Sequence, residues 1–485
     1  MPAMAENLTI AMSLNADCIV AAIRAIMIAL ACAAAAAIIE PYLRSTALSL
    51  KRVAWSLMII VMLTPTILPG YALSDFAIAR MNHPAQSQVA YTALMILRLT
   101  PLAVLIRHLI SGTITPEAMH CQRLLAGDRR SFSTAFSMAV MRLRGSAGSA
   151  GLAFVLVFML AFTEFEIASF LSVPHWTVKL FDAQAGGYPL VASLHLARLP
   201  FAICVAVVLT GLWSLSRTRW NPNRTSSITT DSCALRATTV WAYLTSAFAL
   251  ITLIPGFVVM RHTLTTAPTS VMHFSLSREM LSSISLAVAA TIAAHCVTCL
   301  ACGDPHRVLT RRTQTLVTLL VLPGLMGPLL LGLLVQRAFQ LPPLKGAYDS
   351  PLPMLFTLCF YVLPYTLLLR LVFQRARPGS QDHTARLLQQ REALKRQAGI
   401  LRWSLGLRNG YWLAAIAFCL AYFDVTISSI LAPTAMTPLM PRLYNFMHYG
   451  QSAVLSAMIC VAFVVPVIII GGALPLWRHV AIRYD

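Results

Sequence analysis

Residues 164–171 of the chain read Glu-Phe-Glu-Ile-Ala-Ser-Phe-Leu, and residues 424–431 read Asp-Val-Thr-Ile-Ser-Ser-Ile-Leu. Both stretches lie toward the end of a long apolar segment and begin with an acid. A proline follows each of them closely, Pro174 in the first case and Pro433 in the second. The shared pattern indicates that the two segments are copies of one another.

The surrounding sequence repeats as well. Residues 179–182 (Lys-Leu-Phe-Asp) precede Gly187 by the same spacing with which residues 442–445 (Arg-Leu-Tyr-Asn) precede Gly450. Upstream, two more pairs of segments match in the same order: residues 100–107 with 363–370, and residues 67–70 with 321–324. Four ordered matches, offset by about half the chain, predict an internal duplication.

The composition predicts a membrane protein. Of the 485 residues, 58% are hydrophobic and 11% are charged, whereas a soluble protein carries about 25% charged residues. Apolar runs of about 20 residues, long enough to cross a bilayer as helices, recur along the whole chain. The eleven cysteines fall mostly inside these runs. We therefore interpret them as small buried hydrophobic residues and not as a disulfide framework.

We expect an all-α polytopic membrane protein with about eleven transmembrane helices in two parallel repeated permease modules. The helices are predicted near residues 16–39, 52–73, 89–111, 147–173, 187–216, 237–260, 281–302, 313–336, 351–374, 403–431 and 449–475. The first module covers residues 1–216, a polar and basic cytoplasmic linker covers 217–236, and the second module covers 237–485. The span at 237–260 has no counterpart in the first module.

The distribution of basic residues predicts the topology. The formal net charge is +20, and most Lys and Arg residues outside the spans lie in alternate loops, at 40–52, 112–146, 217–236, 303–312, 375–408 and 476–485. Such enrichment marks the cytoplasmic side. We expect a multi-pass protein of the cell (inner) membrane with its N-terminus outside and its C-terminus in the cytoplasm. The positive charge is interpreted as topology and lipid contact, and no nucleic-acid partner is expected.

Two cytoplasmic loops, 112–146 and 375–402, are longer than the others and occupy equivalent places in the two modules. Each contains a stretch suited to a short helix at the membrane surface, 115–127 in the first loop and 385–399 in the second. No segment outside the membrane is long enough for a catalytic domain. The chain also lacks a G-x-x-x-x-G-K-[ST] sequence. We therefore expect no enzymatic activity and no cofactor.

These features resemble the two-module inner-membrane permeases of binding-protein-dependent (type I) ABC importers, in the group of iron(III) and thiamine systems. The matching features are the proline-containing span, the long loop after it, the acidic span with its following proline, and the segment from 441 to Gly450. The resemblance implies a translocation pathway between the modules. It also implies two soluble partners: a separate ATP-binding subunit, expected as a dimer on the cytoplasmic face, and an external solute-binding protein.

In that family the long loop carries an E-A-A-x-x-x-G signature, whose short helix docks into the ATPase. In the first loop Gly127 fits the glycine, while Glu117 lies several residues early. In the second loop Glu392 fits the acid, and Gly399 falls one residue late. The resemblance assigns the ATPase contact to these four residues together with Arg391 and Leu394.

Charged residues inside the predicted spans need partners or water, because each costs at least ~2.5–3.5 kcal/mol at mid-depth. One interpretation places Glu164 and Asp424 beside a central pathway, at equivalent positions. The other has Glu164 and Glu166 near the outer interface, where they pair locally with Arg98 or Lys179. We favour the local pairing for Glu166 and leave both interpretations open for Glu164 and Asp424. Arg198 is a further charged residue of this kind.

Two other groups of residues need interpretation. His295, Cys296, Cys299, Cys302 and His306 have a spacing that could hold a soft metal ion. The first module has no cysteines at the corresponding place, so we favour a packed helix end and expect no metal.

Pro101 and Pro364 are expected to interrupt their helices, either as gate hinges or as packing kinks. Their duplication in the same context favours hinges.

Three functions remain possible on this sequence. The first is the permease subunit of an ABC importer. The second is a secondary transporter driven by an ion gradient, which predicts acids and bases paired near mid-bilayer and broken helices. The third is a degenerate permease that acts as a sensor or assembly partner.

Overall fold

In the computed structural model the described part of the backbone is mostly helical and contains no strand. The structure describes residues 2–79, 83–109, 121, 148–217, 234–270, 277–302, 319–375, 384, 387–388, 390, 395–403, 408–448 and 452–483. Helices satisfy all backbone polar groups within one segment, as a lipid environment requires.

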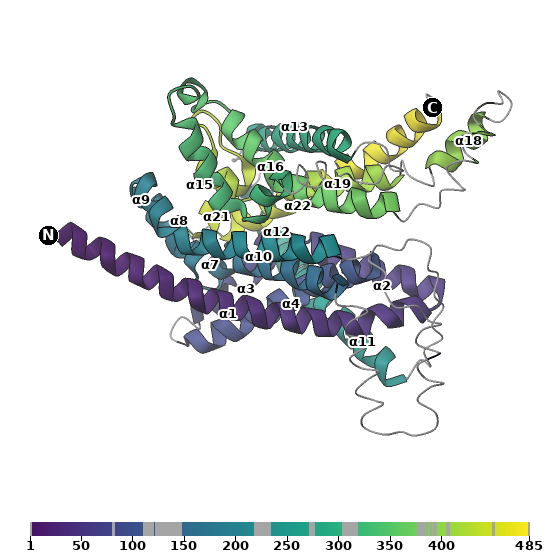
Figure 1. Ribbon diagram of the computed structural model, residues 1–485, viewed down its shortest axis with the longest axis horizontal. Helices are drawn as coiled ribbons and strands as arrows, with labels where there is room; N and C mark the ends of the chain where they lie inside the picture. Colours follow the sequence, from purple (N-terminus) through teal and green to yellow (C-terminus); the bar gives the residue numbers. More distant parts are fainter. Residues whose placement is uncertain are drawn as a thin grey trace.

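The helices of the first half (residues 1–216) are followed by an additional element and then by those of the second half (Figure 1). In the first half they are α1 (Pro2–Ser45), α2 (Leu48–Leu63), α3 (Ile67–Ala79), α4 (Pro84–Leu109), helix Gly148–Phe162, α7 (Glu166–Phe170), α8 (Trp176–Ala185), α9 (Leu190–Leu196) and α10 (Arg198–Arg217). The additional element comprises α11 (Ala234–Phe248), the π-helical turn η1 (Ala249–Leu253) and α12 (Ile254–Ser270). The second half continues with α13 (Ser277–Cys302), helix Leu319–Leu325, α15 (Pro328–Phe339), η3 (Lys345–Ala347), α16 (Leu352–Arg375), α18 (Lys395–Arg402), α19 (Arg408–Tyr422), α20 (Thr426–Leu431), α21 (Leu439–His448) and α22 (Ser452–Arg483).

Many of these helices are apolar and long. Within the described residues, six are long and apolar enough to cross a membrane alone, and up to nine spans result if each of three bent pairs counts as one. This architecture agrees with the predicted class, an α-helical membrane protein. The larger predicted number includes 147–173 and 403–431, each of which the structure divides into two shorter helices.

Three of the predicted spans are bent, among them 187–216, where α9 and α10 meet at 54°. The other two bends are sharper. Segment 52–73 is divided into α2 and α3, which meet at 77°, and segment 313–336 into Leu319–Leu325 and α15, which meet at 112°. A proline follows each break, in Thr64-Pro65 and in Gly327-Pro328. Proline has no backbone N–H with which to continue a helix, and Gly327 adopts a φ of 91°, which glycine tolerates best.

The expected match between residues 67–70 and 321–324 does not mark equivalent places. The first of these segments follows its bend, whereas the second precedes it. Thr64-Pro65 and Gly327-Pro328 are the pairs that occupy the two bends.

The hydrophobic core has two parts, and each includes a helix from the other half. The first part centres on α1 and α4 and takes in Leu329, Leu330 and Leu333 of α15. The second centres on α13, α16 and α19 and takes in Ile67, Leu68 and Tyr71 of α3. In Figure 1, α1 and α4 lie low in the view and α13, α16 and α19 lie high. The arm after each bend thus packs into the opposite half.

The additional element contacts both halves. α11 packs on α1 and α2, whereas α12 packs on α3 and α22. A hydrogen bond of 2.8 Å joins the hydroxyls of Thr64 and Thr252 at the first bend, and one of 2.9 Å joins Tyr71 Oη to His262 Nδ1. The element therefore holds the first bend and its arm from one side.

Candidate functional site

A cavity of about 240 Å³ lies between the two halves. α4 and the segment around 163–166 line it from the first half, and α16 with residues 324–328 and 416–426 line it from the second. Most of the lining is apolar. The polar lining residues are Thr64, Thr66, Arg98, Thr163, Glu164, Glu166, Tyr361, Tyr365, Asp424 and Thr426.

The break in the first half is fixed by hydrogen bonds around Glu164. Its Oε1 accepts the backbone N–H of Ile167 at 2.8 Å, which satisfies a free donor at the start of α7. Thr177 Oγ1 donates to the carbonyl oxygen of Glu164 at 2.7 Å, and Trp176 Nε1 donates to that of Phe162 at 2.8 Å. The start of α8, which follows the acid in the chain, thus folds back over the break.

The break in the second half has the same local geometry. Asp424 Oδ2 accepts the backbone N–H of Ile427 at 2.8 Å and that of Ser428 at 3.2 Å, at the start of α20. In both halves the acid accepts from the residue three positions later. These acids therefore have a structural role as helix caps in addition to any role in the cavity.

Glu166 links the two breaks. Its Oε1 accepts the backbone N–H of Val425 at 3.4 Å, across the boundary between the halves. The local pairing that the sequence favours for Glu166 is therefore replaced by a contact with the opposite half.

Arg98 is the basic residue of the cavity lining. It lies on α4, in electrostatic range of Glu164 and Glu166. Among the described residues, no ion pair joins it to either acid. Three carboxylates and one guanidinium thus share an otherwise apolar cavity, where charges without partners are costly. They are available to water, protons or a charged solute.

Lys179 is not the partner of the cavity acids. Its Nζ lies 2.6 Å from Asp17 Oδ2, so it ties α8 to α1. Arg442 forms the corresponding ion pair with Glu279 and ties α21 to α13. Arg198 is exposed at the start of α10 and does not line the cavity. The sequence did not reveal these ion pairs, because their members are far apart in the chain.

The prediction that Pro101 and Pro364 interrupt their helices is wrong. They lie inside α4 and α16, which run on through them. Pro101 leaves the carbonyl of Leu97 without its helical donor, and Tyr243 Oη donates to that oxygen at 2.8 Å. At Pro364 the chain of Gly324 packs against the ring and against the carbonyl of Phe360. Tyr243 of α11 thus compensates Pro101, whereas at Pro364 a glycine allows the close approach of the neighbouring chain.

Most of the residues assigned to the ATPase contact, Glu117, Gly127, Arg391, Glu392 and Leu394, lie outside the described residues. Gly399 is described: it is buried inside α18, which packs on α22. Within the helix predicted at 385–399, Leu387 and Leu388 are helical, and the described helix α18 covers Lys395–Arg402; the rest of 385–394 lies outside the described residues except Gln390.

The group around His295 is a helix-packing contact where it is described. Arg370 Nη1 donates to Cys299 Sγ at 2.7 Å. The side chains of Cys302 and His306 lie outside the described residues. Among those described, no three His, Cys, Asp or Glu residues are grouped so that they could hold a metal ion.

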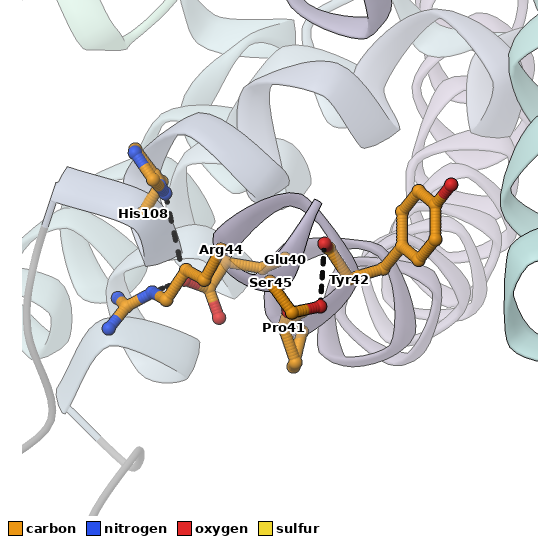
Figure 2. Close-up of polar contacts among 6 residues, drawn as sticks. All are labelled: Glu40, Pro41, Tyr42, Arg44, Ser45 and His108. Carbon is orange, nitrogen blue, oxygen red and sulfur yellow. Dashed lines mark hydrogen bonds and ion pairs between the residues drawn. The ribbon is translucent and has the colours of Figure 1, made fainter. Parts of the chain in front are cut away.

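A polar cluster that the sequence reading missed lies where α1 and α4 end. Arg44 pairs with the buried Glu40 one turn before it, and His108 Nδ1 lies 3.7 Å from Glu40 Oε1 (Figure 2). The ring of Trp55 packs on that of His108, with centroids 5.1 Å apart. The i, i+4 spacing of Glu40 and Arg44 was the available signal. The cluster anchors α4 directly before the first long loop.

Comparison of the chain with known protein families, with curated proteins and with solved structures finds no match.

Proposed function

We propose that the chain is the transmembrane permease subunit of an ABC-type solute importer, built from two repeated modules that enclose one pathway. The observation that carries this proposal is the cavity, because corresponding positions of α4 and α16 line it. The corresponding pairs are Arg98 and Tyr361, Leu102 and Tyr365, Leu105 and Leu368, and Ile106 and Leu369. Each pair has the same separation along the chain as Pro101 and Pro364.

The buried faces of the helices support the repeat. On α1 the buried residues include Ala21, Ala25, Ile28, Cys32 and Ala36, and on α13 they include Ser283, Ala287, Ala290, Ala294 and Thr298. The two sets have the same spacing. α1 packs along α4 as α13 packs along α16, and α8 contacts α1 as α21 contacts α13. Equivalent helices thus pack on equivalent neighbours in the two halves, and the acids bond the backbone in the same way, as expected for a duplicated module.

The proposed topology has the N-terminus outside and the C-terminus inside the cell membrane. The two chain ends lie toward opposite ends of the molecule in Figure 1, as an odd number of spans requires. Cysteines introduced at Ser226 and Ser380 should react with thiol reagents only from the cytoplasm, and a cysteine at Ser270 only from outside. Reaction of Ser226→Cys with an impermeant external reagent would overturn this topology.

Coupling to a separate ATPase is tested by purification from native membranes in mild detergent. We expect an ATP-hydrolysing subunit to bind the chain through loops 112–146 and 375–402. Leu394→Asp and Gly127→Arg should each release it. Leu344→Asp is the matched control, because Leu344 is an exposed leucine on the predicted outer side. Retention of the ATPase by both loop variants would refute the coupling assignment.

A specific observation also favours a second candidate, an ion-driven secondary transporter. Three carboxylates and Arg98 line one buried cavity beside broken helices, which is the arrangement found at ion-coupled sites. The two candidates differ in their partner. Two results together would favour the second candidate. The chain would purify without any ATPase and carry proton or Na⁺ flux in proteoliposomes by itself, and the single substitution Asp424→Asn would abolish that flux.

A further inference from the structure

Four aromatic side chains from α7 and its flank, α8 and α21 gather beside the cavity. Phe165, Phe170 and Phe181 come from the first half and Tyr444 from the second. Ring centroids are 4.5 Å apart for Phe165 and Phe181, and 6.0, 5.7 and 6.4 Å from Tyr444 to Phe165, Phe170 and Phe181, respectively. Phe165 also lines the cavity, so this aromatic cluster borders the cavity on one side.

One hydrogen bond inside the aromatic cluster crosses between the halves. The hydroxyls of Ser169 and Tyr444 lie 2.8 Å apart. Ser169 is on α7, directly after the capped acidic break, and Tyr444 is on α21. Separation of the halves at this end would break this bond and expose the rings to water.

The repeat leaves this bond without a counterpart. Phe181 occupies in α8 the place that Tyr444 occupies in α21, because each lies two residues after its ion-paired base, Lys179 or Arg442. Ser429 follows Asp424 by the spacing with which Ser169 follows Glu164. Phenylalanine has no hydroxyl, so the symmetry-related pair, Phe181 and Ser429, cannot form the bond.

We propose that the aromatic cluster is the outer gate of the pathway and that the bond between Ser169 and Tyr444 is a polar latch on it. This inference rests on the proposed function, since it assumes a solute pathway through the cavity and the topology given above. The rings close the cavity by apolar contact. The latch fixes the register of the two halves in the closed state.

The native Cys419 provides the readout, because it lines the cavity behind the aromatic cluster. In a variant that retains Cys419 as its sole cysteine, an impermeant methanethiosulfonate reagent added outside reacts only when the gate is open. Loss of one net hydrogen bond in Tyr444→Phe should speed the reaction about fivefold. Phe181→Tyr, which supplies a hydroxyl at the position of α8 that corresponds to Tyr444, should slow it by a similar factor if the new hydroxyl bonds Ser429.

Tyr348→Phe is the matched control. It removes a hydroxyl that accepts a hydrogen bond from Gln336 at 3.1 Å, away from the aromatic cluster. A Tyr444→Phe rate equal to that of the control overturns the latch, and acceleration only from the cytoplasmic side overturns the assignment as an outer gate. The accelerated reaction in a chain that binds no ATPase supports the gate while it refutes the importer, so the two proposals fail separately.

Discussion

The two acidic breaks, around Glu164 and Asp424, are alike in their local chemistry. Each acid caps the short helix that follows it, and each is succeeded by an ion pair that ties the next helix to the first long helix of its half. Residues that shape the backbone or join neighbouring helices are thus present in both halves. Similar turns at two places require similar capping and pairing groups.

The interiors of the two halves differ. In the first half the guanidinium of Arg24 lies 5.2 Å from the ring of Tyr91, and its two terminal nitrogens are buried with no hydrogen-bond partner among the described residues. At the corresponding places of the second half are the buried, apolar Leu286 and Met354. The cavity differs in the same sense, with Arg98 opposite Tyr361. Charge, unlike turn chemistry, therefore differs between the halves and makes the cavity asymmetric.

Exchange of the interior residues tests this comparison with the largest expected effect. Leu286→Arg should lower the free energy of unfolding by at least ~2.5–3.5 kcal/mol, because it places a charge in an apolar site with no prepared partner. Arg24→Leu should cost less than this, since it loses the contact with the Tyr91 ring, worth about 0.5–2 kcal/mol, but also removes a buried charge. Thermal unfolding of the purified protein in detergent measures both. Equal destabilisation by the two variants would mean that Arg24 is as strongly stabilised at its site as Leu286 is at its own. The two interiors would then not differ in their tolerance of charge.

Gly327→Ala tests the two bends. An added Cβ would force a residue with a side chain into φ 91° and would lie 2.5 Å from Thr163 Cβ. We expect a loss of about 1–3 kcal/mol from backbone strain alone. Thr64→Ala, at the other bend, removes the bond to Thr252 and should cost about 1 kcal/mol. Gly346→Ala is the control, because open space surrounds that position. A loss at Gly327 no larger than in the control would show that the bends impose no special backbone requirement.

The capping acids test the likeness of the breaks. Asp424→Ala and Glu164→Ala should each cost about 0.5–2 kcal/mol, and the loss should be larger for Asp424, which accepts two backbone N–H groups. Asp424→Asn and Glu164→Gln retain an acceptor oxygen and should recover most of the stability. Failure of these amides to do so would assign the stability to the negative charge and not to the cap.

The ion pairs should give the smallest effect. Lys179 is 41% exposed and its pair is screened by solvent, so Lys179→Met should cost less than about 1 kcal/mol. Arg442 is 25% exposed and also lies over Phe446 at 5.5 Å, so Arg442→Met should cost more. Double variants with Asp17→Asn and Glu279→Gln separate the pairing energy from other losses. A larger loss at Lys179 would reverse the ranking of the two pairs.

Several features of the site could be predicted from the sequence. The matched octapeptides identified Glu164 and Asp424, and the structure places both on one cavity. The paired prolines located α4 and α16, although neither helix is interrupted. Tyr243 from another element compensates Pro101, and Gly324 packs closely against Pro364. The predicted match between 67–70 and 321–324 is wrong, because a Pro-Gly pair can lie on either side of a bend. Thr64-Pro65 and Gly327-Pro328 were the better signal, because their separation equals that of Pro101 and Pro364.

The class of the protein could be predicted from the amino-acid sequence. The lengths of the apolar segments can be read directly, and acids, prolines and glycines mark the breaks because local chemistry fixes backbone turns. Which residues meet could not be predicted. The structure places α3 and α15 each in the opposite half, pairs Lys179 with Asp17, joins Glu166 to Val425 and Ser169 to Tyr444, and sets Arg24 against the ring of Tyr91. Most of these contacts join segments far apart in the chain, and no local pattern encodes which apolar faces pack together.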